Sequence, residues 1–329
     1  MGGGCAGHNP MCGLQAPPAA PRLQPGRLGV MVRDKLLYFY LGPRQRAQVT
    51  AREPKILTRI VEVVTAAGWQ VVLLPEEARH AAASMDGYQM VLNQAVEGPF
   101  CLSLRKCYME PFWRIETVND RWAWQAARLP FDPGQVRAPY VRAFFDRWRG
   151  NLFGGAPITR EGFVFVPLQG KLRRNRSFQS MSPLAMLETV LERETRPVLA
   201  TLHPGESYAD EEIAALRGLE RRYPGFALSS DRSVDLLRRC DAVVTQNSSL
   251  ALTGYFARKP AVLFAEADFH HIAGSVPQVG VDRALAQMAR EAAYAEYVYW
   301  FFKMQAITAW SDDVHAQIAA RLRTHGWPV

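Results

Sequence analysis

The feature that most constrains this fold is the alternation of short apolar segments with helix-length segments. In the second half of the chain, apolar runs typical of strands occupy residues 163–169, 197–203, 226–230, 241–246 and 260–265. Helical patterns lie between them, at about residues 182–195, 209–222, 232–239 and 248–259. Parallel strands need such crossovers, so the pattern predicts a doubly wound α/β domain.

The first half repeats the pattern less regularly. Strands are predicted at residues 35–41, 69–75 and 100–104, with helices at about residues 54–67 and 87–96. The Gly- and Pro-containing segment 154–162 marks the best domain boundary. We predict an α/β fold class of two Rossmann-like doubly wound domains, at residues 33–155 and 160–281. A C-terminal helical segment, residues 282–329, follows and packs across both domains. Residues 1–32, rich in Gly, Pro and Ala, are predicted to be a flexible extension, with Met31 as an alternative start to Met1.

Composition limits the class of protein. The 329 residues carry a net charge of +8, which favours anionic partners. The five cysteines are odd in number and lack CxxC spacing, which indicates free thiols in a reducing compartment. The start has no signal-peptide pattern, and no uncharged apolar stretch reaches about 18 residues. We therefore expect a cytoplasmic location, and peripheral contact with the inner membrane stays open. Nucleic-acid-binding motifs, the Walker phosphate loop and the G-x-G-x-x-G loop are absent, which argues against a nucleic-acid partner, a P-loop NTPase and an NAD(P) enzyme.

Three polar segments of the second domain follow predicted strands. They are "PLQGKLRRNRS", "LHPGES" and "TQNSS". Ligands of open parallel sheets bind beyond the carboxyl ends of the strands, so the three segments should meet at one edge. In the first segment, Lys171, Arg173, Arg174 and Arg176 form either a solvated loop or an anion clamp.

The other two segments also have two interpretations each. His203 and Pro204 form either a plain turn or a phosphate contact at a strand end. In "TQNSS", Asn247 or Ser248 can cap the next helix, and the free N–H groups there also suit an anion. The tandem Ser248-Ser249 exceeds what capping needs.

Together, "LATLHP" and "DAVVTQNSSLALTGYFARKPAVLF" resemble the donor domain of bacterial capsular-polysaccharide glycosyltransferases that include the Kdo transferases. The His-Pro and Ser-Ser motifs are also similar to those of bacterial sialyltransferases. The resemblance covers about residues 160–265. It implies a two-domain GT-B fold and a CMP-activated acidic sugar as donor. By the resemblance, His203 and Pro204 bind the donor phosphate, and Ser248 and Ser249, with Gln246 and Asn247 beside them, hold it at the helix N-terminus.

The chain departs from these families at the general base. An inverting transferase needs a group that deprotonates the acceptor hydroxyl, usually a carboxylate of the N-terminal domain. The sialyltransferase-like pattern is an acidic pair before Gly, and this chain has only "MDG". Asp86 and Glu110 are therefore the candidates for catalysis, and Glu116, Asp120 and Asp132 stay open.

Three aromatic or histidine-rich stretches have simpler explanations. Glu266, Asp268, His270 and His271 gather in one segment, but the two histidines are adjacent and lack chelating spacing, so no metal site is predicted. This loop after the last strand is instead expected to line the crevice, and a contact of His270 or His271 with a sugar is open. The aromatic segment 293–310 is expected in the core rather than at a membrane surface. We expect Trp122 and Trp124 in the core and leave Trp113 open.

The sequence therefore predicts an inverting glycosyltransferase without a cofactor. It moves Kdo or a sialic-acid-like sugar from a CMP-sugar to a surface polysaccharide or a lipid-linked acceptor in capsule biosynthesis. One alternative is a non-catalytic nucleotide- or glycan-binding factor in capsule assembly or export, which would contact other assembly proteins. Another is a UDP-sugar transferase or epimerase of the same fold.

Overall fold

The computed structural model describes residues 34–329, without side-chain placement for residues 81–84 and 138. The predicted extension at residues 1–32, the alternative start at Met31, and Cys5 and Cys12 lie outside the described residues. The three described cysteines, Cys101, Cys107 and Cys240, are buried free thiols, as the sequence predicted.

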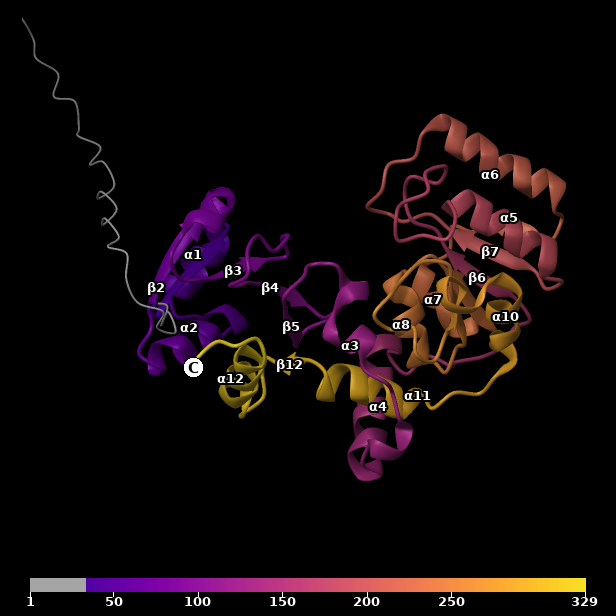
Figure 1. The fold of residues 1–329 in the computed structure, drawn as a ribbon. Coiled ribbons are helices and arrows are strands. Elements are labelled where there is room, and N and C mark those ends of the chain that lie inside the picture. The colour runs from indigo at the N-terminus through magenta and orange to yellow at the C-terminus, as the bar shows by residue number, and fades with distance from the viewer. Residues whose placement is uncertain (1–33) are drawn as a thin grey trace, which may run out of the picture. The chain divides into compact units, whose positions relative to one another are not determined.

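The first sheet has the strand order β12-β5-β4-β3-β1-β2. Strands β2, β3, β4, β5 and β12 are labelled in Figure 1. Its strands are β1 (Leu36–Leu41), β2 (Gln70–Pro75), β3 (Tyr88–Leu92), β4 (Cys101–Lys106), β5 (Phe112–Glu116) and β12 (Ile307–Thr308). Strands β1 to β4 are parallel, whereas β5 runs antiparallel to β4 and β12 antiparallel to β5.

The predicted helix at residues 87–96 is wrong, because this segment contains strand β3. The first four residues of β3 are all buried, between β1 and β4. A central parallel strand is apolar on both faces, so it lacks the alternation that would distinguish it from a helix. Strand β5, in the irregular region 106–149, was not predicted.

Helices of the first half connect these strands. They are α1 (Pro43–Thr50), α2 (Ile56–Ala66), η1 (Glu76–Ser84), η2 (Arg121–Ala123), α3 (Gln125–Arg128), η3 (Pro133–Gln135) and α4 (Ala138–Phe153). Helix α2 buries Ile60 and Val64 completely in the core of the first sheet. Helix α4 ends at Gly154, which adopts the left-handed conformation typical of a helix C-terminus.

The second sheet is entirely parallel, with the order β11-β10-β9-β6-β7-β8. Its strands are β6 (Val164–Pro167), β7 (Val198–Thr201), β8 (Phe226–Leu228), β9 (Ala242–Thr245), β10 (Ala261–Leu263) and β11 (Gly274–Ser275). Its helices are α5 (Pro183–Arg193), α6 (Asp210–Arg222), α7 (Ser233–Arg239), α8 (Ser249–Tyr255), α9 (Val276–Val279), α10 (Val281–Ala286) and η4 (Gln287–Ala289). The two sheets with their helices confirm the predicted α/β fold class.

The C-terminal segment continues from the second sheet to the first. It forms α11 (Tyr294–Tyr299), the π-helix η5 (Trp300–Met304), β12 and α12 (Val314–Thr324), and α12 packs on α2. Tyr297, Phe301 and Phe302 are completely buried, which confirms the core interpretation of the aromatic segment. Within residues 34–329, no helix combines the length and apolar character that crossing a membrane requires.

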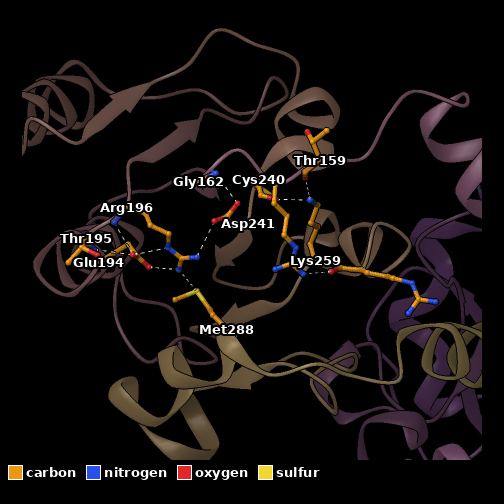
Figure 2. Close-up of polar contacts among 11 residues, drawn as sticks. Thr159, Gly162, Glu194, Thr195, Arg196, Cys240, Asp241, Lys259 and Met288 are labelled. Carbon is orange, nitrogen blue, oxygen red and sulfur yellow. Dashed lines mark hydrogen bonds and ion pairs between the residues drawn. The ribbon is translucent and has the colours of Figure 1, made fainter.

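A network of hydrogen bonds and ion pairs lies at the amino edge of the second sheet, where the chain enters β6, β7, β9 and β10 (Figure 2). The Arg196 guanidinium donates from Nε and Nη2 to the two oxygens of Glu194, at 2.9 and 2.7 Å, and its Nη1 lies 3.6 Å from Asp241 Oδ2. Asp241 Oδ1 accepts from the Gly162 N–H. Buried Lys259 donates to the carbonyls of Thr159 and Cys240, at 2.5 and 2.6 Å. These bonds fix the segment that enters β6.

Candidate active site

A cavity of about 290 Å³ lies at the carboxyl edge of the second sheet. The first half of the chain contributes one wall, called here the first wall, which consists of Arg105, Tyr108, Arg121 and Trp122. The second half contributes the second wall, which consists of Gln169, Phe178, His203, Asn247, Ser248, Ser249, Glu266 and Ala267.

Strand ends explain why these side chains meet. Gln169 follows β6, His203 follows β7, Ser248 follows β9 and Glu266 follows β10. These strands are parallel neighbours, so their carboxyl ends open on the same edge. In the first sheet, Arg105 lies at the carboxyl end of β4. The structure thus brings the segments "LHP" and "TQNSS" together in one cavity.

His203 is exposed and its ring is oriented by its own turn. Its Nδ1 accepts a hydrogen bond from the Gly205 N–H at 3.1 Å. Its backbone N–H donates to the Tyr208 hydroxyl at 2.8 Å. With Nδ1 accepting, the neutral imidazole carries its proton on Nε2, where it can donate to an anionic ligand. Pro204 is exposed and outside the cavity lining.

The "TQNSS" segment contains both a cap and cavity residues. Ser248 is the N-cap of α8, and its Oγ accepts from the Leu250 N–H at 3.3 Å. Asn247 donates from Nδ2 to the Glu266 carbonyl, which ties two cavity residues together. Gln246 is buried, lies outside the cavity lining and donates to the Met181 carbonyl. Ser249 is exposed at the cavity, so the second serine is free of the capping role.

The first wall contains two arginines. Arg105 Nη1 donates to the carbonyl and the side-chain oxygen of Asn119, at 2.8 and 3.3 Å. Arg121 Nη2 donates to the Lys106 carbonyl, and its guanidinium carbon lies 4.1 Å from the centre of the Tyr108 ring. Burial and the neighbouring Arg121 lower the pKa of Arg105.

Buried Asp268, from the second half of the chain, supports this wall through Tyr108. The Tyr108 hydroxyl donates to Oδ1 of Asp268, which is completely buried. Burial raises the pKa of Tyr108 well above its usual value, so the phenol keeps the proton that it donates. Burial also raises the pKa of the Asp268 carboxyl, against the attraction of buried Arg114.

Aromatic side chains join the two walls. The Trp122 ring stacks on Phe178 with ring centres 4.6 Å apart, and the Arg176 guanidinium lies 4.9 Å from the Phe178 ring centre. The expectation that Trp122 fills the core is wrong, because it is half-buried and lines the cavity. Trp124 is completely buried, as expected. Trp113, left open, is half-buried and donates to Glu110.

The basic segment after β6 lies outside the cavity lining. Lys171, Arg173 and Arg174 are exposed, and Lys171 has a positive φ of 60°. Arg176 is half-buried, and its guanidinium lies over the ring of Phe178, which lines the cavity. Of this cluster, none lines the cavity directly.

The predicted base candidates also lie outside the lining. Asp86 is exposed and precedes β3, at the amino end of that strand. Glu110 pairs with Lys106 at 3.1 Å and accepts from Trp113. The three open candidates are placed elsewhere too: Glu116 is buried and accepts from the Gln125 N–H, Asp132 caps η3, and Asp120 is exposed. Among the described side chains, Glu266 is the carboxylate that lines the cavity.

The two adjacent histidines are half-buried and lie outside the cavity lining. Their rings stack with centres 4.3 Å apart. His271 Nε2 donates to the Leu129 carbonyl and Nδ1 accepts from the Tyr297 hydroxyl, both at 3.0 Å. Burial and the neighbouring His270 lower the pKa of His271 to about 4. The part of the chain that the structure describes contains no cluster of His, Cys, Asp and Glu suited to a metal ion.

Sequence reasoning missed Arg105, Tyr108 and Arg121. It considered Glu266 only as part of a rejected metal cluster, although it expected that loop to line the crevice. One signal favours both Arg105 and Glu266: Arg105 ends β4 and Glu266 follows β10, the position where the carboxyl-end rule searches. Arg121 and Tyr108 stand in irregular segments, so only the tertiary structure places them in the cavity.

Comparisons with known proteins give weak similarities. No protein-family model and no curated protein sequence matches the chain. Among solved structures, the Thermosulfurimonas dismutans KpsC beta Kdo 2,7 transferase aligns with a TM-score of 0.47 and 11% identity, over 87% of this chain and 98% of that one. The beta Kdo 2,4 transferase of the same organism's KpsC gives 0.44 and 12%, over 79% and 88%. The H444N variant of the wall teichoic acid polymerase TagF gives 0.28 and 8%, over 88% and 89%.

Proposed function

We propose that the protein is an inverting glycosyltransferase that moves an acidic sugar from a CMP-sugar to a surface-polysaccharide or lipid-linked acceptor in capsule biosynthesis. The observation that carries this proposal is the cavity where His203, Ser249 and Glu266 meet at the carboxyl edge of a parallel sheet. The opposite wall supplies two arginines, so the cavity suits a ligand with negative charge.

In the proposed reaction, an acceptor hydroxyl oxygen attacks the anomeric carbon while the bond from that carbon to the phosphate oxygen breaks. CMP leaves with the bond electrons, and the acceptor proton passes to a base. Donation from His203 Nε2 and the Ser249 hydroxyl stabilises the charge that develops on the phosphate. We assign the base to Glu266 rather than to Asp86 or Glu110, because only Glu266 lines the cavity.

The experiment is a transfer assay with CMP-Kdo and CMP-sialic acid, together with binding of CMP and UDP measured by calorimetry. CMP binding with transfer supports the proposal. Failure of every CMP-sugar to bind would overturn the donor assignment, and preference for UDP would favour a UDP-sugar transferase or epimerase.

A non-catalytic binding factor is the second candidate, because the carboxylates predicted in the first half lie outside the cavity. It predicts CMP or glycan binding without turnover, unchanged when Glu266 is replaced by glutamine. A loss of turnover in the Glu266→Gln variant excludes it.

A further inference from the structure

The first wall presents two cationic side chains without a directly paired carboxylate among the described residues. In the described part of the chain, neither the Arg105 nor the Arg121 guanidinium forms an ion pair with a carboxylate. The Nε–H groups of both are buried and lack a hydrogen-bond partner among the described residues. Arg196 at the amino edge is different, because Glu194 and Asp241 neutralise it.

The two arginines are also close enough to repel each other. The neighbouring charge of Arg121, added to burial, lowers the pKa of Arg105, and the groups that oppose this are Tyr108, Asp268 and Asp120. Of these, Asp268 is completely buried, is absent from the cavity lining and accepts a hydrogen bond from the Tyr108 hydroxyl. Two like charges beside a polar cavity are unfavourable unless an anion binds between them.

We propose that Arg105 and Arg121 form a subsite for the carboxylate of the acidic sugar, separate from the groups that bind the donor phosphate. The guanidinium fork matches the two oxygens of a carboxylate. The identity of the sugar rests on the proposed function. The phosphate contacts, His203 and Ser249, belong to the second wall, so the two anionic groups of the ligand are bound by different halves of the chain.

Tyr108 is the positioning residue of this subsite. Its ring lies beneath the Arg121 guanidinium, and its hydroxyl is fixed by buried Asp268. Its φ of 64° is uncommon for a residue other than glycine, which shows that the surrounding contacts impose its conformation. Asp268 therefore holds Arg121 in the cavity through Tyr108, without touching the ligand.

The test compares the binding of free Kdo with that of its methyl ester, which lacks the negative charge. The wild-type chain should bind the acid about 10- to 100-fold more tightly, since hydrogen bonds from charged groups are the strong ones. Arg105→Gln and Arg121→Gln should remove this difference while lowering the affinity for CMP much less. Arg142→Gln, on the exposed face of α4 with its side chain 91% exposed, is the matched control.

Two further variants keep the test decisive if a glutamine variant fails to fold. Arg121→Lys keeps the charge without the fork and should keep part of the preference for the acid. Tyr108→Phe keeps the ring and should weaken the preference less than Arg121→Gln does. Equal binding of acid and ester by the wild type, or an equal loss of CMP and Kdo affinity in the variants, would overturn the subsite. Because this arm needs no nucleotide, its failure is distinct from a failure of CMP to bind, which would overturn the proposed function.

Discussion

The two edges of the second sheet use charge in opposite ways. At the amino edge, Arg196 is bonded to Glu194 and Asp241, and Lys259 donates to two carbonyls (Figure 2). At the carboxyl edge, His203 and Glu266 line a cavity, opposite Arg105 and Arg121. Among the described residues, none of these four side chains forms an ion pair.

We infer from this difference that the charges at the amino edge stabilise the fold and that the charges at the carboxyl edge bind a ligand. The bonds from Arg196 hold the pKa of Glu194 below its usual range although burial opposes this, so the pair is complete within the protein. Buried polar groups without a partner, such as the Nε–H groups of Arg105 and Arg121, carry a desolvation cost. We therefore expect substitutions at the carboxyl edge to change catalysis, and substitutions at the amino edge to change stability.

The largest effect is expected for Glu266→Gln. Removing the proposed base should lower kcat by about 10²- to 10⁴-fold, the usual contribution of general base catalysis. Steady-state kinetics with a CMP-sugar donor measures it, and Glu211→Gln, an exposed residue of α6, is the matched control. If Asp86→Asn or Glu110→Gln causes the loss instead, the base belongs to the first half and the role of Glu266 is different.

The second prediction concerns His203→Ala. Loss of the Nε2 donor should lower kcat by about 10²- to 10³-fold, as removal of one donor to a developing anion does elsewhere. The free energy of unfolding should stay near wild type, because His203 is exposed. His315→Ala on α12, whose imidazole pairs with Glu62, serves as the control. A variant that loses stability but not turnover would place His203 with the structural groups.

The sequence predicted the second sheet better than the first, and the second wall better than the first wall. The segments around His203 and Ser248 follow short apolar strands, so the carboxyl-end rule locates them from local pattern alone. Arg121 and Tyr108 reach the cavity through antiparallel β5 and the irregular segments around it, and their roles depend on a partner, Asp268, far along the chain. Strand β3 was predicted as a helix for a related reason: its burial on both faces is set by its neighbours in the sheet.

Lys259→Met tests the amino edge. The substitution keeps the aliphatic length but removes the donor to the Thr159 and Cys240 carbonyls. The free energy of unfolding should fall by about 2–4 kcal/mol, because two acceptors lose their bonds. Urea denaturation measures it, with exposed Lys55→Met as control. The folded variant should keep its kcat, and a large loss of kcat without loss of stability would contradict the separation of the two edges.

His271 provides a contrast with His203. It also lies in a segment after a strand, β10, but both of its ring nitrogens are hydrogen-bonded within the protein. Its pKa is lowered from 6.5 to about 4, so the unfolded chain binds a proton that the folded chain does not. Stability is therefore complete above pH 6.5 and declines as the pH falls toward 4, by about 2 kcal/mol at pH 5. Denaturation of wild type and His271→Leu at pH 7 and pH 5 measures this contribution. An equal pH dependence in both would show that His271 is not its source.

The smallest effect is expected for the triple variant Lys171→Gln, Arg173→Gln and Arg174→Gln. These side chains lie at the carboxyl edge but are exposed and outside the cavity, so they act on an anionic donor only through the screened long-range field. We expect kcat/KM to fall by about 2- to 5-fold at low salt and to approach wild type at high salt, where the Debye length shortens. Kinetics at two ionic strengths distinguishes this from direct binding. A salt-independent loss as large as that of His203→Ala would mean that this loop binds the donor phosphate directly. In that case, the residues that bind the ligand would be identified by their position at the strand ends, and not by a charge in the cavity that lacks an ion-pair partner.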